Sequence, residues 1–72
     1  MAEAAVSDAK YRAARALTAS PVTALRELRV ERSGRTLRLH GRVHCFYHKQ
    51  LAQELVRPAA KGLRLVNQVV VE

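Results

Sequence analysis

The spacing of apolar residues changes repeatedly along this chain of 72 residues, and the changes restrict the folds that it can adopt. Apolar residues recur at helical spacing over residues 8–19 and 47–60, but they alternate with polar residues over residues 28–43 and 63–71. The first pattern is typical of an amphipathic helix and the second of a half-buried strand. With a turn at Gly34, the expected order is helix, strand, strand, helix, strand.

Two amphipathic helices and three half-polar strands can bury their apolar sides only against one another. The expected fold class is therefore α+β: a two-layer sandwich, with a three-stranded mixed sheet and two helices on one face. A right-handed crossover through the second helix makes the second and third strands parallel. The other face of the sheet is expected to stay uncovered.

The ends of the helices follow from capping residues and from proline. Ser7 and Asp8 suit a helix start, so residues 1–7 are expected to form a flexible N-terminus before a single domain over residues 8–72. The second helix either ends at Arg57, before Pro58, or continues until Gly62 stops it. In the second strand, Gly41 is expected to let a helix approach the backbone closely.

The composition limits the class of protein. Thirteen lysines and arginines against six acidic residues give a net charge of +7, with +3 on residues 1–36 and +4 on residues 37–72, so the charge is spread along the chain. A hydrophobic content of 49% is too high for a disordered chain. Neither a membrane-spanning run of about 20 apolar residues nor a signal peptide is recognisable. A cytoplasmic protein, free or peripheral to a membrane, is expected.

The residues that could carry chemistry are few. Asp8 is the only aspartate, and the serines occupy cap or turn positions, so we expect no enzymatic activity. His40, His44, His48 and Cys45 are the candidate metal ligands. His40 and His44 would lie about 13 Å apart on a strand, so neither a metal site nor a cofactor is expected. His48 is expected to be partly buried and hydrogen-bonded.

The uncovered face of the sheet is expected to be cationic. Strand alternation places on it Arg29, Arg38, Arg42, Arg64 and His40. One interpretation is an ordinary solvated face, with Glu31 compensating part of the charge. The other is a docking surface for anionic lipid headgroups or an acidic protein. Ten of the thirteen cations are arginines, which favours forked contacts to phosphate or carboxylate.

A second candidate feature is Phe46 at the start of the second helix. Helical spacing directs Phe46 toward Lys49 and away from the core, and an exposed aromatic beside a cation suits insertion into an interface. The alternative is that Phe46 folds back over the edge of the core.

Several segments resemble the BON domain, a small lipid-associated module of bacterial osmotically inducible and nodulation proteins. The segment Leu37-Arg-Leu-His-Gly-Arg-Val43 resembles the family pattern V-x-L-x-G-x-V, and Leu65-Val-Asn-Gln-Val-Val-Val71 is similar to V-x-N-x-L-x-V. The resemblance runs from Asp8 to Val71 and implies the same order of elements. It also implies association with phospholipid.

The leading hypothesis is a non-enzymatic, BON-like binding module that attaches to anionic phospholipid or to an acidic, envelope-associated partner. The residues expected to make these contacts are Arg29, Arg38, Arg42, Phe46 and Lys49. The alternative is a protein-interaction domain without lipid binding, or a homo-oligomer formed through the strand edge at Val69-Val70-Val71. Nucleic acid is not expected as a partner, because the strands carry no aromatic residues that could stack on bases.

Overall fold

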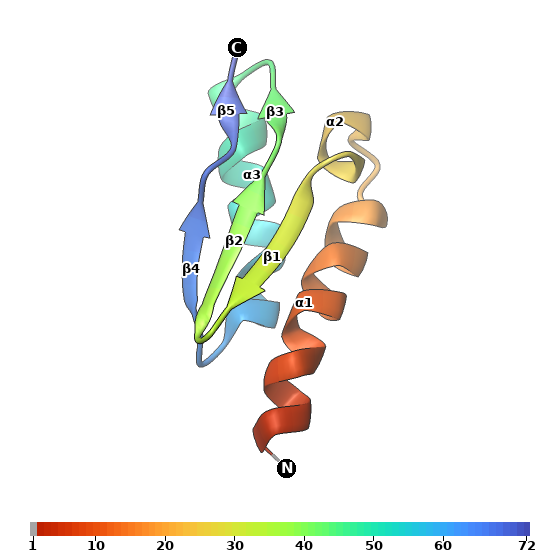
Figure 1. Cartoon of the computed structure of the whole chain (residues 1–72). Helices are drawn as coiled ribbons and strands as arrows, with labels where there is room; N and C mark the ends of the chain where they lie inside the picture. Colours follow the sequence, from red (N-terminus) through yellow and green to blue (C-terminus); the bar gives the residue numbers. More distant parts are fainter. Residues whose placement is uncertain (1) are drawn as a thin grey trace.

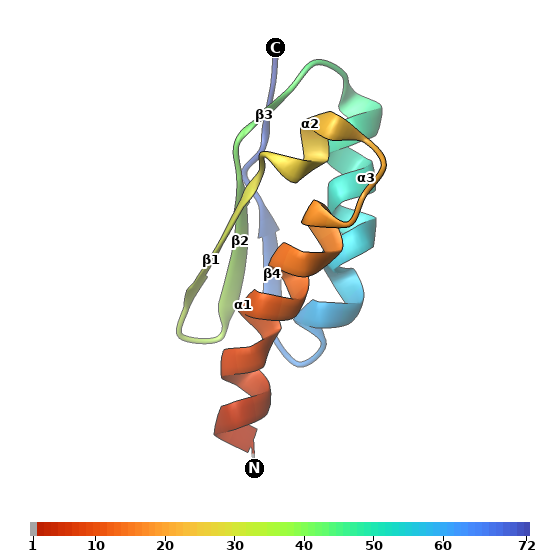
Figure 2. The same cartoon turned by 90° about the vertical axis from the view of Figure 1, so that its right-hand side faces the viewer.

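The protein forms two layers, a sheet and a pair of helices. The computed structural model describes residues 2–72, and side chains from residue 8 onward. The elements are α1 (Ala2–Thr18), α2 (Thr23–Arg26), β1 (Arg29–Ser33), β2 (Thr36–His40), β3 (Arg42–Val43), α3 (Phe46–Val56), the 3₁₀ helix η1 (Arg57–Ala60), β4 (Arg64–Asn67) and β5 (Val70–Val71). Helices α1 and α3 pack together on one face of the sheet (Figures 1 and 2). The expected α+β sandwich is confirmed.

The sheet is mixed, as the crossover rule predicts. Strand β1 pairs antiparallel with β2, which pairs parallel with β4, and β3 pairs parallel with β5. Paired residues of the parallel strands differ by 28 positions both before and after the interruption. Hydrogen bonds from Gln68 N to Leu39 O and from Val70 N to Gly41 O, both 2.9 Å long, cross the gap. Strands β2 and β3 are therefore two parts of one predicted strand, and β4 and β5 are two parts of another.

Gly41 lies at this division and has a positive φ of 133°. A Cβ atom there would lie 2.5 Å from Cδ2 of Leu28 and 3.4 Å from its Cα. The close approach that we expected at Gly41 therefore exists, but its partner is wrong: Leu28, in the segment entering β1, occupies the space and not a helix. The missing side chain lets Leu28 join the core.

Pro58 changes the type of helix without ending the helical path. The α-helix α3 stops at Val56, and η1 carries Pro58 in its first turn, where the missing N–H costs nothing. Gly62 follows with φ of 84° and turns the chain into β4. The α-helix thus ends next to the proline, and the helical path as a whole ends at the glycine.

The first helix begins earlier than predicted. Helix α1 starts at Ala2, so the expected start at Ser7 and Asp8 is wrong; the alanine-rich segment before them has a high helix propensity. Its first turns extend beyond the β1–β2 hairpin (Figures 1 and 2). The flexibility expected for residues 1–7 stays a prediction, and Met1 lies outside the described residues.

A short helix that we did not predict, α2, connects α1 to the sheet. Its Leu25 is completely buried, which fixes the connection to the core. Ser20 Oγ accepts a hydrogen bond of 3.1 Å from the N–H of Val22, and Arg26 Nε donates one of 2.9 Å to the carbonyl of Ser20. These bonds satisfy polar groups at the turn between the two helices.

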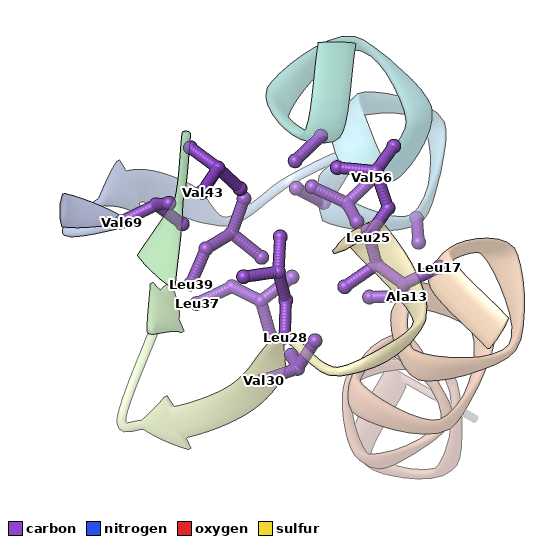
Figure 3. Close-up of a cluster of buried hydrophobic side chains, with 13 residues drawn as sticks. Ala13, Leu17, Leu25, Leu28, Val30, Leu37, Leu39, Val43, Val56 and Val69 are labelled. Carbon is purple, nitrogen blue, oxygen red and sulfur yellow. The ribbon is translucent and has the colours of Figure 1, made fainter. Parts of the chain in front are cut away.

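The core fills the space between the layers, as Figure 3 shows. Its fully buried larger side chains are Leu17, Leu25, Leu37, Leu39, Val43, Val56 and Val69. Helix α1 contributes Ala9 and Ala13 beside Leu17, and these small residues allow close packing. The core occupies one face of the sheet only, so alternate side chains of every strand point the other way.

Candidate anionic-surface binding site

The uncovered face of the sheet, toward the viewer in Figure 1, carries four arginines. Strand alternation places them there, because Val30, Leu37, Leu39 and Val43 are buried on the opposite face. The four are Arg29, Arg38, Arg42 and Arg64; Arg38 is half-buried, and the other three are exposed. The structure thus brings together three of the predicted site residues, Arg29, Arg38 and Arg42, on one surface.

Two carboxylates lie close to these arginines. Glu31 Oε1 lies 2.7 Å from Nε2 of His40, although the pair does not have hydrogen-bond geometry. Glu72 lies 3.8 Å from Arg42, and both side chains are more than half exposed, so water weakens this ion pair. Glu31 also faces Arg38 across the β1–β2 ladder. Four guanidinium groups against two carboxylates leave this face positively charged.

Three apolar or aromatic side chains are exposed toward the end of the molecule where β3 and β5 stop and α3 begins, an end that Figures 1 and 2 show in ribbon form. Phe46 is 66% exposed, Tyr47 69% and Val70 52%. The interpretation of Phe46 as an exposed aromatic is therefore correct, and its folding over the core edge is wrong. Val70 pairs in register with Arg42 on the uncovered face, so it adjoins the arginines, whereas Phe46 and Tyr47 belong to the helical layer.

Lys49 lies apart from the arginines. It is half-buried on α3, in the helical layer, and its carbonyl accepts a 2.9 Å hydrogen bond from Nδ2 of Asn67 on β4. Of the five predicted site residues, three lie on the sheet face, Phe46 lies at the apolar end, and Lys49 packs near β4. We call Arg29, Arg38, Arg42, Arg64, Phe46, Tyr47 and Val70 the docking surface.

Asn67 holds the edge strand against α3, a role that the sequence analysis missed. Its Nδ2 donates to Lys49 O and, over 3.3 Å, to Oε1 of Gln53, while its Oδ1 accepts a 3.1 Å hydrogen bond from the N–H of Val69. The clasp bends the chain between β4 and β5 and turns Val69 into the core, where it is 1% exposed. The prediction of an unprotected strand edge at Val69-Val70-Val71 is therefore wrong at Val69. Of the three valines, Val70 and Val71 are exposed.

The histidines and the cysteine are separated. His40 lies on the sheet face, His44 and Cys45 are exposed in the turn after β3, and His48 is half-buried on α3. Among the side chains of residues 8–72, no three potential ligands come together in a way that could hold a metal ion. The hydrogen bond expected for His48 is not formed at Nδ1, which is buried without a partner among the described residues.

Within the part of the chain that the structure describes, no helix has the length and apolar character needed to cross a bilayer. Comparison with protein-family models, with curated proteins and with solved structures finds no match to this chain. The docking surface therefore has to be interpreted from its own chemistry.

Proposed function

We propose that this protein is a non-enzymatic binding module that docks onto anionic phospholipid through the docking surface. The observation that carries this proposal is the gathering of four arginines on an uncovered sheet face, with Val70 paired to Arg42 and two exposed aromatic side chains at the start of α3. Cations attract an anionic membrane surface, and aromatic side chains at its boundary insert among the headgroups.

The arginines supply the electrostatic part of the binding. A guanidinium group presents a planar fork of donors that matches phosphate oxygens, which a lysine ammonium does not. Each basic residue near an anionic leaflet contributes about 1 kcal/mol, so four of them give attraction that is useful but reversible. Reversible attachment is what a peripheral protein requires.

The apolar end supplies the second part. Phe46 and Tyr47 lie at the beginning of α3 with about two thirds of their surface in water, and Val70 is exposed on β5 beside Arg42. Uncharged side chains that insert into the membrane interface would anchor the protein more firmly than charge alone. We infer a peripheral location on the cytoplasmic leaflet, whose anionic lipids provide the required surface potential.

The resemblance to the BON domain supports the same interpretation. Lipid association is what that resemblance implies. Self-association through β5 is a weaker candidate, because Val69 points inward and two copies of a chain with a net charge of +7 repel each other.

Co-sedimentation with vesicles tests the proposal. The protein should bind vesicles that contain phosphatidylserine, should bind pure phosphatidylcholine vesicles much less, and should dissociate as the salt concentration rises. Absence of binding to both vesicle types would contradict the proposal. A protein that instead forms dimers in sedimentation equilibrium, without vesicle binding, would favour self-association.

A further inference from the structure

The free edge of β4 borders a groove that the docking surface does not use. The groove has a volume of about 490 Å³ and lies between β4 and the C-terminal part of the helical layer. Its apolar lining includes Ala60, Leu63 and Leu65, and Arg57 and Lys61 add positive charge. This volume is within the range of about 300–1,000 Å³ of ligand-binding clefts.

The backbone of β4 offers hydrogen-bonding groups at the same place. Arg64 N and Gln68 N donate to the carbonyls of Arg35 and Leu39, so these alternate positions of the strand face β2. In a parallel strand, the N–H and C=O groups of the residue between, Leu65, then point away from the sheet. They are the groups that an added strand would pair with.

The free part of this edge is short because both of its ends are closed. The N–H of Leu63 donates to the carbonyl of Ala60 over 2.8 Å, and the N–H of Val69 donates to Oδ1 of Asn67 over 3.1 Å. The open stretch therefore centres on Leu65. It can hold a segment of a few extended residues rather than a long strand.

The charges around the groove select the occupant. Lys61 is exposed and has no carboxylate within ion-pair distance among the described residues, whereas Arg57 shares its charge with Glu54, 2.9 Å away. Arg64 belongs to the uncovered face and does not line the groove, so Arg57 and Lys61 are the cations of the groove. A second copy of this chain would bring the same cations to the edge, so like-charge repulsion disfavours it. An acidic segment is the complementary occupant.

We propose that the β4 edge binds an extended, acidic peptide segment of another protein by strand addition. Side chains of an extended peptide alternate, so every second one turns toward the groove. An apolar residue would enter between Leu63 and Leu65, and acidic residues two positions before and after it would approach Arg57 and Lys61. Backbone pairing at Leu65 would supply affinity, and these side chains would supply specificity.

The experiment uses a fluorescently labelled peptide with the core Glu-Thr-Leu-Thr-Glu and the whole protein, in the absence of lipid. Replacing both glutamates of the peptide with lysine should weaken binding at least tenfold. Two further peptides carry N-methyl groups on alternate amides, in opposite phases. Only the phase that faces β4 should lose at least tenfold in affinity, and equal effects of the two phases would contradict strand addition.

Two protein variants with equal changes of charge locate the binding site. Lys61→Glu should weaken peptide binding at least tenfold, whereas Arg32→Glu, on β1 at the opposite edge of the sheet, should change it less than threefold. Peptide binding should also slow hydrogen exchange of the Leu65 amide at least tenfold. Equal loss in both variants, no binding at all, or unchanged exchange at Leu65 would overturn the proposal. None of these outcomes bears on vesicle binding.

Discussion

At the scale of single residues, Gly41 decides whether the sheet can carry both the core and the docking surface. A side chain at this position would meet Leu28 from one side of the strand while Arg42, the next residue, faces solvent on the other. The positive φ of Gly41 is a second reason why this position requires glycine, since residues with a Cβ atom rarely adopt such a φ. An alanine at this position would force the side chain of Leu28 to shift.

The substitution Gly41→Ala should therefore destabilise the protein by about 2 kcal/mol or more, through backbone strain and overpacking. Gly34→Ala is the matched control, because Gly34 also has a positive φ, of 59°, but open space around it. The control should cost about 1 kcal/mol. Urea titration measures both free energies of unfolding. An equal loss of free energy of unfolding in the two variants would show that the side chain of Leu28 moves aside without destabilising the protein.

Leu39 tests the assignment of the strand faces. Its side chain is completely buried between the sheet and the helices, and Arg38 and His40 on either side point to the uncovered face. Leu39→Ala should lower the free energy of unfolding by about 2–5 kcal/mol, because it leaves a cavity. Chemical denaturation of the variant provides the measurement. A loss below about 0.5 kcal/mol would mean that the faces are reversed.

At the scale of elements, the position of β4 and β5 depends on the clasp formed by Asn67. Asn67→Ala removes the acceptor of the Val69 amide and the side-chain nitrogen that donates both hydrogen bonds to α3. The expected cost is about 1–3 kcal/mol, the range for groups left unsatisfied. Amide exchange at Val69 should accelerate more than exchange at Leu39. The exposed neighbour Gln68, changed to alanine, is the control, and an equal acceleration in that variant would argue against a specific clasp.

The beginning of α3 provides a separate prediction about membrane contact. Replacing Phe46 and Tyr47 with serine should leave the stability within about 0.5 kcal/mol per site, because both side chains are exposed. Binding to anionic vesicles should weaken several-fold, and the salt dependence should remain. Tyr11→Ser is the control, since Tyr11 is 60% exposed on α1, away from the docking surface. Equal weakening by the control would contradict a role for the aromatic pair.

The elements also show what the sequence could and could not predict. Alternation placed Arg38 and Leu39 on the correct faces, because the period of a strand is a local property. The partner of Gly41 and the clasp of Asn67 depend on segments distant in sequence, Leu28 and α3, which no local pattern identifies. The start of α1 was misplaced because a capping residue is only a preference, and an alanine-rich segment can continue a helix through it.

At the scale of the whole molecule, the two layers separate the core from the docking surface. Because both long helices cover the same face, four arginines of the strands lie together on the other one. The sequence predicted this cationic face but not the place of Val70 beside Arg42, which requires the register of β3 with β5. Lys49, expected on the same surface, lies instead in the helical layer.

The double variant Arg38→Glu/Arg42→Glu tests the central claim most directly. It lowers the net charge from +7 to +3 and leaves the core untouched, so the fold should persist. Its control, Lys10→Glu/Arg12→Glu, makes the same change of charge on the exposed side of α1. In co-sedimentation with phosphatidylserine vesicles, the first variant should lose most of its binding and the control should retain most of it. Equal binding by both variants would contradict docking through the sheet face.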